Sequence, residues 1–218
     1  MSKDNTYENL KNLGFNPEVI VDCGAAWGDW SGMVKQLFPD SFILSIDANP
    51  WTNGQINGST VTEIAVLSDE DNKEMIFYRK KDAIDQGTYC TGDSLFKEQT
   101  QHYTNVNTIE DKVLTTTLKT ILNKHNKDNI DLLKIDTQGS ELIIMKGLGS
   151  ILHDVEFIEL ECSIIEYNIG GCCFTDVVEF LKDDFDIFDI VDLQYHYGFL
   201  AHIDVIFKNK KSKIVKPL

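Results

Sequence analysis

Three carboxylates, Asp47, Asp136 and Glu161, each end a short run of mostly apolar residues. A carboxylate can accept hydrogen bonds from hydroxyl groups or act as a general base. Ligands of doubly wound α/β proteins lie beyond the carboxyl ends of the strands, so we expect these side chains at one site. Asp136 is our first candidate for the chemistry, as a general base or a positioning group, although a carboxylate at this position can also cap the following helix.

Glu161 and His196 are the two further catalytic candidates. The imidazole of His196 titrates near neutrality, which suits a base, but a histidine between Tyr195 and Tyr197 can equally be a packed surface residue. Asp136 and Glu161 could together hold a divalent cation such as magnesium. Their spacing does not require one, so we predict no metal site.

A turn of small residues, Gly24 to Gly28, follows the first apolar run. Such a turn lets the backbone approach a ligand closely, and the next helix begins with free N–H donors. A dinucleotide fingerprint needs glycine at the first, third and sixth positions. Counted from Gly24, those later positions hold Ala26 and Asp29, which disfavours a buried pyrophosphate.

Asp47 lies 23 residues after Gly24, close to the spacing at which a carboxylate receives both ribose hydroxyls. The turn and this carboxylate together predict a bound nucleoside without a pyrophosphate, and S-adenosylmethionine fits that description. We expect Ala65 near the adenine. The predicted cofactor-binding residues are Asp22, Gly24, Ala25, Gly28, Asp47, Ala48 and Ala65.

The elements that must position these residues alternate between strands and amphipathic helices. This alternation predicts an α/β fold with a doubly wound, mostly parallel seven-stranded sheet whose last strand is antiparallel. A further strand over 74–78 is expected to form a hairpin with the third strand. The expected sheet strands are 18–23, 41–47, 60–67, 130–136, 155–161, 185–191 and 201–207, and the expected helices are 30–38, 118–122, 141–148 and 174–181.

The length of 218 residues suits a single domain with a core over about 18–207. The polar, irregular stretch 81–112 is long for a connection, which favours a lid or substrate loop. The last segment, 208–218, contains five lysines. It is either a solvated end or a docking segment for an anionic partner.

Composition excludes several classes of function. The chain has 20 basic and 35 acidic side chains, a net charge of −15, which disfavours nucleic acid as a partner. No apolar run is long enough to cross a membrane, and residues 1–16 lack the apolar region of a signal peptide. Five cysteines in no regular framework are expected to be reduced thiols, which favours a cytoplasmic protein.

Two segments resemble a known family. Val19–Trp30 resembles motif I of class I S-adenosylmethionine-dependent methyltransferases, and Leu132–Gly147 contains the Ile-Asp-x-x-Gly-x-Glu run and Lys-Gly ending of the FkbM-like methyltransferases. The resemblance spans roughly 18–207. It implies a Rossmann-like fold, S-adenosylhomocysteine as the product of the cofactor, and O-methylation of a hydroxyl on a sugar or natural product.

The sequence therefore predicts an O-methyltransferase acting on a hydroxyl of a saccharide or glycosylated metabolite, with a small-molecule or glycan acceptor. A non-catalytic nucleoside-binding or scaffold protein of the same fold remains an alternative. A nicotinamide-dependent oxidoreductase is a further alternative that the missing glycines disfavour. The acceptor, the methylated position and the oligomeric state stay open.

Overall fold

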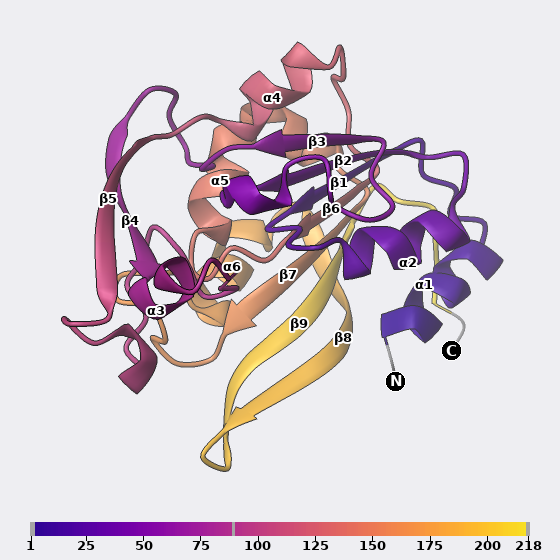
Figure 1. The fold of residues 1–218 in the computed structure, drawn as a ribbon. Coiled ribbons are helices and arrows are strands. Elements are labelled where there is room, and N and C mark those ends of the chain that lie inside the picture. Colours follow the sequence, from indigo (N-terminus) through magenta and orange to yellow (C-terminus); the bar gives the residue numbers. More distant parts are fainter. Residues whose placement is uncertain (1–2, 89, 217–218) are drawn as a thin grey trace.

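The computed structural model describes residues 3–88 and 90–216, and its seven-stranded sheet has the order β3-β2-β1-β6-β7-β9-β8 (Figure 1). All neighbouring strands are parallel except the two pairs that include β9. The predicted fold class is therefore confirmed. The strands are β1 (Val19–Cys23), β2 (Phe42–Asp47), β3 (Val61–Ile64), β6 (Leu132–Ile135), β7 (Phe157–Ser163), β8 (Phe185–His196) and β9 (Phe199–Asn209).

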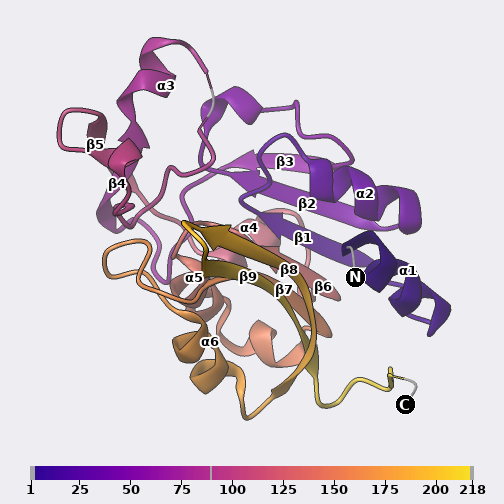
Figure 2. The same cartoon turned by 90° about the horizontal axis from the view of Figure 1, so that it is seen from below.

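Helices cover both faces of this sheet (Figure 2). On one face, α1 (Lys3–Asn12) and α2 (Asp29–Leu37) pack over a core that includes Phe157 and Ile206. On the other face, α4 (Leu118–Lys124), α5 (Glu141–Leu148) and α6 (Phe174–Leu181) pack over the larger core. Short 3-10 turns, η1 (Pro50–Thr52) and η3 (Gly149–Asp154), follow β2 and α5.

The N-terminal helix α1 was not predicted, because its segment is mostly polar. Two of its side chains, Tyr7 and Leu10, are nevertheless fully buried against the sheet. The Tyr7 ring meets the Trp30 ring edge-on with centroids 5.8 Å apart, and the Tyr7 hydroxyl hydrogen-bonds the carboxylate of Glu159. Tertiary packing thus stabilises a helix whose sequence pattern is weak.

The strand expected over 74–78 forms, but its predicted pairing with the third strand is wrong. β4 (Glu74–Lys80) pairs antiparallel with β5 (Thr108–Leu114), in a second sheet that stands apart from the main one (Figure 1). The chain turns away after β3 because the Ser68 N–H donates to the Thr116 carbonyl, at 3.0 Å. The stretch 81–112 thus includes α3 (Lys81–Asp85), η2 (Gln101–Tyr103) and the first residues of β5.

The last two strands form the predicted antiparallel hairpin, and both are longer than expected. β8 continues to His196 and β9 begins at Phe199, so the turn between them consists of Tyr197 and Gly198, both with positive φ. Figure 1 shows the end of this hairpin projecting from the rest of the molecule. Within the described ranges, no helix is long and apolar enough to cross a membrane.

Candidate functional site

A cavity of about 230 Å³ lies beyond the carboxyl ends of the parallel strands. In the sheet, β1 lies between β2 on one side and β6 on the other, so the order of the strands reverses at β1. The cavity opens at this point, between the ends of β1 and β6. Among the predicted residues, the cavity is lined by Gly24, Asp47, Ala48, Ala65, Asp136 and Glu161. The sheet topology thus brings together groups that lie far apart in the sequence.

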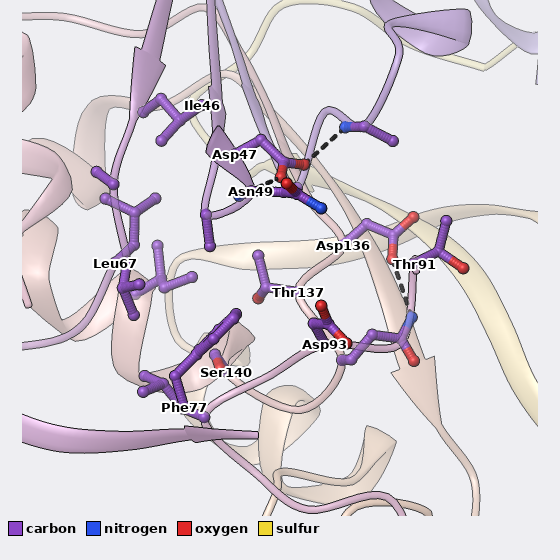
Figure 3. Close-up of a pocket in the computed structure, with 18 of the residues that line it drawn as sticks. Ile46, Asp47, Asn49, Leu67, Phe77, Thr91, Asp93, Asp136, Thr137 and Ser140 are labelled. Carbon is purple, nitrogen blue, oxygen red and sulfur yellow. Dashed lines mark hydrogen bonds between the residues drawn. The ribbon is translucent and has the colours of Figure 1, made fainter. Parts of the chain in front are cut away.

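Asp47 lies at the end of β2 with its carboxylate fixed by backbone donors. Its Oδ2 accepts the Ala26 N–H and its Oδ1 accepts the Asn49 N–H, each at 2.8 Å (Figure 3). A carboxylate accepts hydrogen bonds, and these two backbone bonds fix its orientation at the cavity. Asp47 also connects the turn after β1 to the loop after β2.

Gly24, Ala25 and Gly28 shape the turn after β1, but only Gly24 reaches the cavity. The N–H groups of Gly24 and Ala25 both donate to the Ile46 carbonyl, at 2.9 and 3.1 Å, which ties the turn to β2. Gly28 has φ +83°, and a Cβ there would lie 2.4 Å from the Asn57 carbonyl oxygen. Ala25 and Gly28 therefore set the shape of the turn from outside the cavity.

Asp22 lies within β1, fully buried and outside the cavity lining. The Ser31 hydroxyl donates to its Oδ2 at 2.6 Å, and the Lys134 ammonium lies 3.7 Å from its Oδ1. Burial raises the pKa of the Asp22 carboxyl, against the opposing effect of Lys134. Asp22 therefore lies beneath the turn, where it contacts β6 and not the cavity.

Asp136 follows β6 and is held by two donors. Lys134 Nζ lies 3.1 Å from its Oδ2, and Gln138 Nε2 lies 3.3 Å from its Oδ1. Burial lowers the pKa of Lys134, but the carboxylates of Asp136, Asp22 and Glu159 outweigh this and raise it strongly. Lys134 is therefore a buried permanent cation between the two aspartates.

Glu161 lies on β7 within reach of two side-chain amides. Gln138 Nε2 donates to its Oε2 at 2.5 Å, and Gln194 Nε2 donates to its Oε1 at 3.2 Å. Burial, followed by the carboxylates of Asp136 and Asp204, raises the pKa of Glu161 well above its ordinary value. This carboxyl therefore keeps its proton to a higher pH than an ordinary glutamate does.

A second cavity, of about 330 Å³, adjoins the first. Both are lined by Cys90, Thr91, Gln138 and Glu161, so these four residues form a shared wall. His196 lines only the second cavity, where it joins Glu161 but not Asp136. The remaining lining residues come from the two-stranded sheet, from the stretch 81–112, from the loop between β7 and α6 and from β8 and β9. They include Lys80, Glu98, Tyr103, Tyr167, Gln194 and His202.

The loop after β6 owes its shape to Glu141, the acid of the Ile-Asp-x-x-Gly-x-Glu run. Its buried carboxylate accepts the Thr137 N–H at 2.9 Å and the Gly139 N–H at 3.2 Å. Gln138, between them, has φ +57°. The Ser94 hydroxyl donates to the Gln138 carbonyl at 2.8 Å, which fastens the stretch 81–112 to this loop.

Sequence reasoning missed Gln138 and His202, and also the cavity wall formed by Phe77, Thr91 and Asp93 (Figure 3). The Asp93 carboxylate accepts the Lys80 N–H at 2.9 Å, so that wall depends on the pairing within the second sheet. A histidine inside the apolar run 201–207 was the available signal for His202.

Comparison with solved structures finds methyltransferases of low similarity. A precorrin-6y C5,15-methyltransferase from Geobacter metallireducens is 15% identical with a TM-score of 0.46, covering 95% of this chain and 87% of that one. A magnesium protoporphyrin IX methyltransferase from Synechocystis is 9% identical (TM-score 0.49; 95% and 79% covered). An N-methyltransferase from Bradyrhizobium japonicum is 10% identical (TM-score 0.44; 96% and 89% covered). Likenesses this weak say nothing about the acceptor.

The match to a protein family, unlike these structural likenesses, identifies what the chain belongs to. No curated protein matches the chain significantly. A family model described as the methyltransferase FkbM domain matches residues 22–200, which is most of the chain. The matched range includes the wall that the two cavities share. The chain therefore belongs to the FkbM methyltransferase domain family, and its cofactor is S-adenosylmethionine.

Proposed function

We propose that the protein transfers the methyl group of S-adenosylmethionine to a hydroxyl oxygen of a saccharide or glycosylated metabolite. The observation that carries this proposal is the wall shared by the two cavities, to which Gln138 and Glu161 both belong. A donor in the first cavity and an acceptor in the second would meet at that wall. Methyl transfer requires such an alignment of the two reactants.

The residues of the first cavity suit the nucleoside part of the cofactor. Gly24 presents only backbone to the cavity, and the Asp47 carboxylate lines the cavity as an acceptor group suited to ribose hydroxyls. Ala48 and Ala65 present small side chains, and Phe77 offers an apolar face. When bound, the cofactor supplies a methyl group on a positively charged sulfur. In this proposal Asp22, Ala25 and Gly28 support the site indirectly, by holding the turn.

The proton of the acceptor hydroxyl must leave as the new oxygen–carbon bond forms. Asp136 and Glu161, joined through the Gln138 amide, lie on the first cavity's wall, and Glu161 and His196 lie on the second. Burial raises the pKa of Glu161, so this carboxyl favours its protonated form more than an ordinary glutamate does. Asp136, paired with Lys134, is better suited to orienting Gln138.

The second cavity combines aromatic rings with hydrogen-bonding groups. Tyr103, Tyr167 and His196 supply rings, and Gln194 and Glu98 supply polar atoms. Saccharide rings present both apolar faces and hydroxyl edges, so this mixture supports a saccharide acceptor. Residues 90–93 and Leu95 already belong to the cavity walls, which supports the proposal that 81–112 closes over the acceptor within a single methyltransferase domain.

A turnover assay tests the proposal. The protein is incubated with S-adenosylmethionine and a panel of saccharides and glycosides, and release of S-adenosylhomocysteine and methylated product is measured by mass spectrometry. We expect a methyl ether on an oxygen, with Asp136→Asn strongly reduced in turnover. A product methylated on nitrogen, or stabilisation by S-adenosylhomocysteine without turnover of any acceptor, would contradict it; the second result favours the non-catalytic alternative.

A further inference from the structure

The histidine His202 is a buried side chain of the second cavity to which the proposed function assigns no role. His202, on β9, is 4% exposed and lines the cavity. Neither its Nδ1 nor its Nε2 has a hydrogen-bond partner in the described part of the chain. Buried polar groups in folded proteins are nearly always partnered, so an imidazole left in this state beside a cavity points to a ligand.

The imidazole is held between two other rings. The Tyr167 ring lies edge-on to it with centroids 4.4 Å apart, and the His196 ring lies 5.8 Å away at an angle of 76°. These contacts restrict the ring without using either nitrogen. Its position is therefore fixed by packing, and no described protein group uses the hydrogen-bonding capacity of its two nitrogens.

The sheet places His202 beside Glu161. In the antiparallel pairing of β7 with β9, Glu161 is opposite Asp204 and Ser163 is opposite His202. Residues two apart on a strand share a face, so Glu161 and His202 lie on the same side of the sheet. Gln194 of β8 is opposite His202 and donates to Glu161 at 3.2 Å, which brings all three to one end of the cavity.

The other candidates for the acceptor's proton are more heavily engaged. Both oxygens of Glu161 accept side-chain amides, and both oxygens of Asp136 face donors. His196 has an exposed side chain at the end of β8. His202 alone among these groups combines burial, contact with the cavity and two unpartnered nitrogens.

We propose that His202 binds the acceptor hydroxyl and takes its proton during methyl transfer, which makes the second cavity the acceptor subsite for a saccharide. This inference rests on the proposed function. The oxygen lone pair forms the new oxygen–carbon bond, and the electrons of the broken sulfur–carbon bond stay on sulfur. The electrons of the oxygen–hydrogen bond stay on oxygen, and the proton passes to a ring nitrogen of His202.

The charge state of His202 agrees with this role. Burial, followed by the neighbouring His196, lowers its pKa, against an opposing effect of Asp136. The other titratable groups that line this cavity are Glu161 on β7, His196 on β8, and Tyr167, Glu98, Lys80, Tyr103 and Cys90. At neutral pH the imidazole is therefore uncharged, with one nitrogen able to accept a proton.

The test compares wild-type protein with His202→Phe and His202→Gln, all saturated with S-adenosylhomocysteine. Binding of a panel of methyl glycosides is measured by saturation-transfer NMR. Thermal stabilisation by S-adenosylhomocysteine shows that each variant is folded and that its cofactor cavity is intact. We expect glycoside affinity to fall about tenfold or more in both variants, as for loss of a buried hydrogen bond. The control His153→Asn removes an exposed histidine whose Nδ1 contacts Asp184, and it should change nothing.

With the glycoside that turns over, kcat should fall roughly a hundredfold or more in His202→Phe, and its pH profile should lose the acidic limb. Equal glycoside binding and turnover in wild type and His202→Phe would overturn the inference while leaving the proposed function intact. Binding of no glycoside by wild-type protein that still binds S-adenosylhomocysteine would overturn the saccharide acceptor, and this inference with it.

Discussion

The Cα of Gly24 packs directly on the backbone carbonyl of Asp136, so closely that a Cβ on Gly24 would lie 1.8 Å from that oxygen. Gly24 also has φ +78°, which residues with a side chain rarely adopt. The contact joins the ends of β1 and β6 at the floor of the cofactor cavity. Only glycine allows the two strands to end this close together.

Gly24→Ala should therefore abolish cofactor binding and destabilise the fold by about 2–5 kcal/mol, from backbone strain and displacement of the loop after β6. Gly14→Ala is the matched control, because Gly14 has φ +94° but nothing within 4 Å of its added Cβ. It should cost only the strain, about 1–2 kcal/mol. Urea unfolding and calorimetry with S-adenosylhomocysteine measure both, and equal effects would contradict the steric argument.

The buried ammonium of Lys134 should be the costliest lysine to remove. Lys134→Met leaves Asp22 and Asp136 without their cation, and we expect a loss of about 3–5 kcal/mol in unfolding free energy. Lys124→Met removes an exposed lysine 2.7 Å from Glu63 and should cost at most about 1 kcal/mol. Similar losses in the two variants would contradict a role for burial.

The same ammonium predicts how stability changes at alkaline pH. The pKa of Lys134 is raised in the folded state, so its contribution is complete below the unfolded pKa of about 10.4 and is lost as pH rises through the folded value. The advantage of wild type over Lys134→Met should hold from neutral pH to about pH 10 and shrink above it. An advantage that falls between pH 7 and 9 would contradict this assignment.

Glu161 predicts a change of stability in the same direction, but at lower pH. Its pKa is raised on folding, so folding favours the protonated carboxyl, and wild type loses stability as pH rises from about 4.3 through the folded pKa. Glu161→Gln, which cannot ionise, should gain stability relative to wild type over that range. Unfolding free energies from pH 4 to pH 8 measure the trend, with the exposed Glu8→Gln as the control. A difference independent of pH would contradict it.

The hydroxyl of Ser94 connects the stretch 81–112 to the loop after β6. Ser94→Ala removes its bonds to the Gln138 and Thr137 carbonyls, and we expect S-adenosylhomocysteine to bind about fivefold more weakly. Ser212→Ala removes a hydroxyl that donates to Glu156 at 2.7 Å, outside both cavities, and should leave affinity unchanged. Unchanged affinity in Ser94→Ala would mean that this bond does not support the cavity wall.

The parts of the site that follow directly from strand ends could be predicted from sequence. Asp47 and Asp136 end apolar runs, and the rule for doubly wound sheets places such residues at the ligand crevice. Asp22 shows the limit of that reasoning. It lies in the same kind of run, but its partners Ser31 and Lys134 come from α2 and β6, and only the packed fold reveals them.

The remaining differences also come from contacts distant in sequence. β4 pairs with β5 across the whole stretch 81–107, and no local pattern specifies that partner. Gln138 is defined by a left-handed backbone and by bonds to Asp136, Glu161 and Ser94, none of which its residue type indicates. His202 looked like part of an apolar strand, and its cavity depends on β8, β9 and the loop that carries Tyr167.

The pairing of β1 with β6 affects how fast the protein can fold. Ile20 pairs with Leu132, more than a hundred positions later, so the cofactor crevice requires closure of a long loop. Contacts of this range slow folding, because chain entropy is lost before the pairing stabilises it. A polypeptide emerging from the ribosome has no crevice until β6 has been synthesised and has docked against β1. In refolding experiments, S-adenosylhomocysteine binding should therefore develop late and report completion of the central sheet.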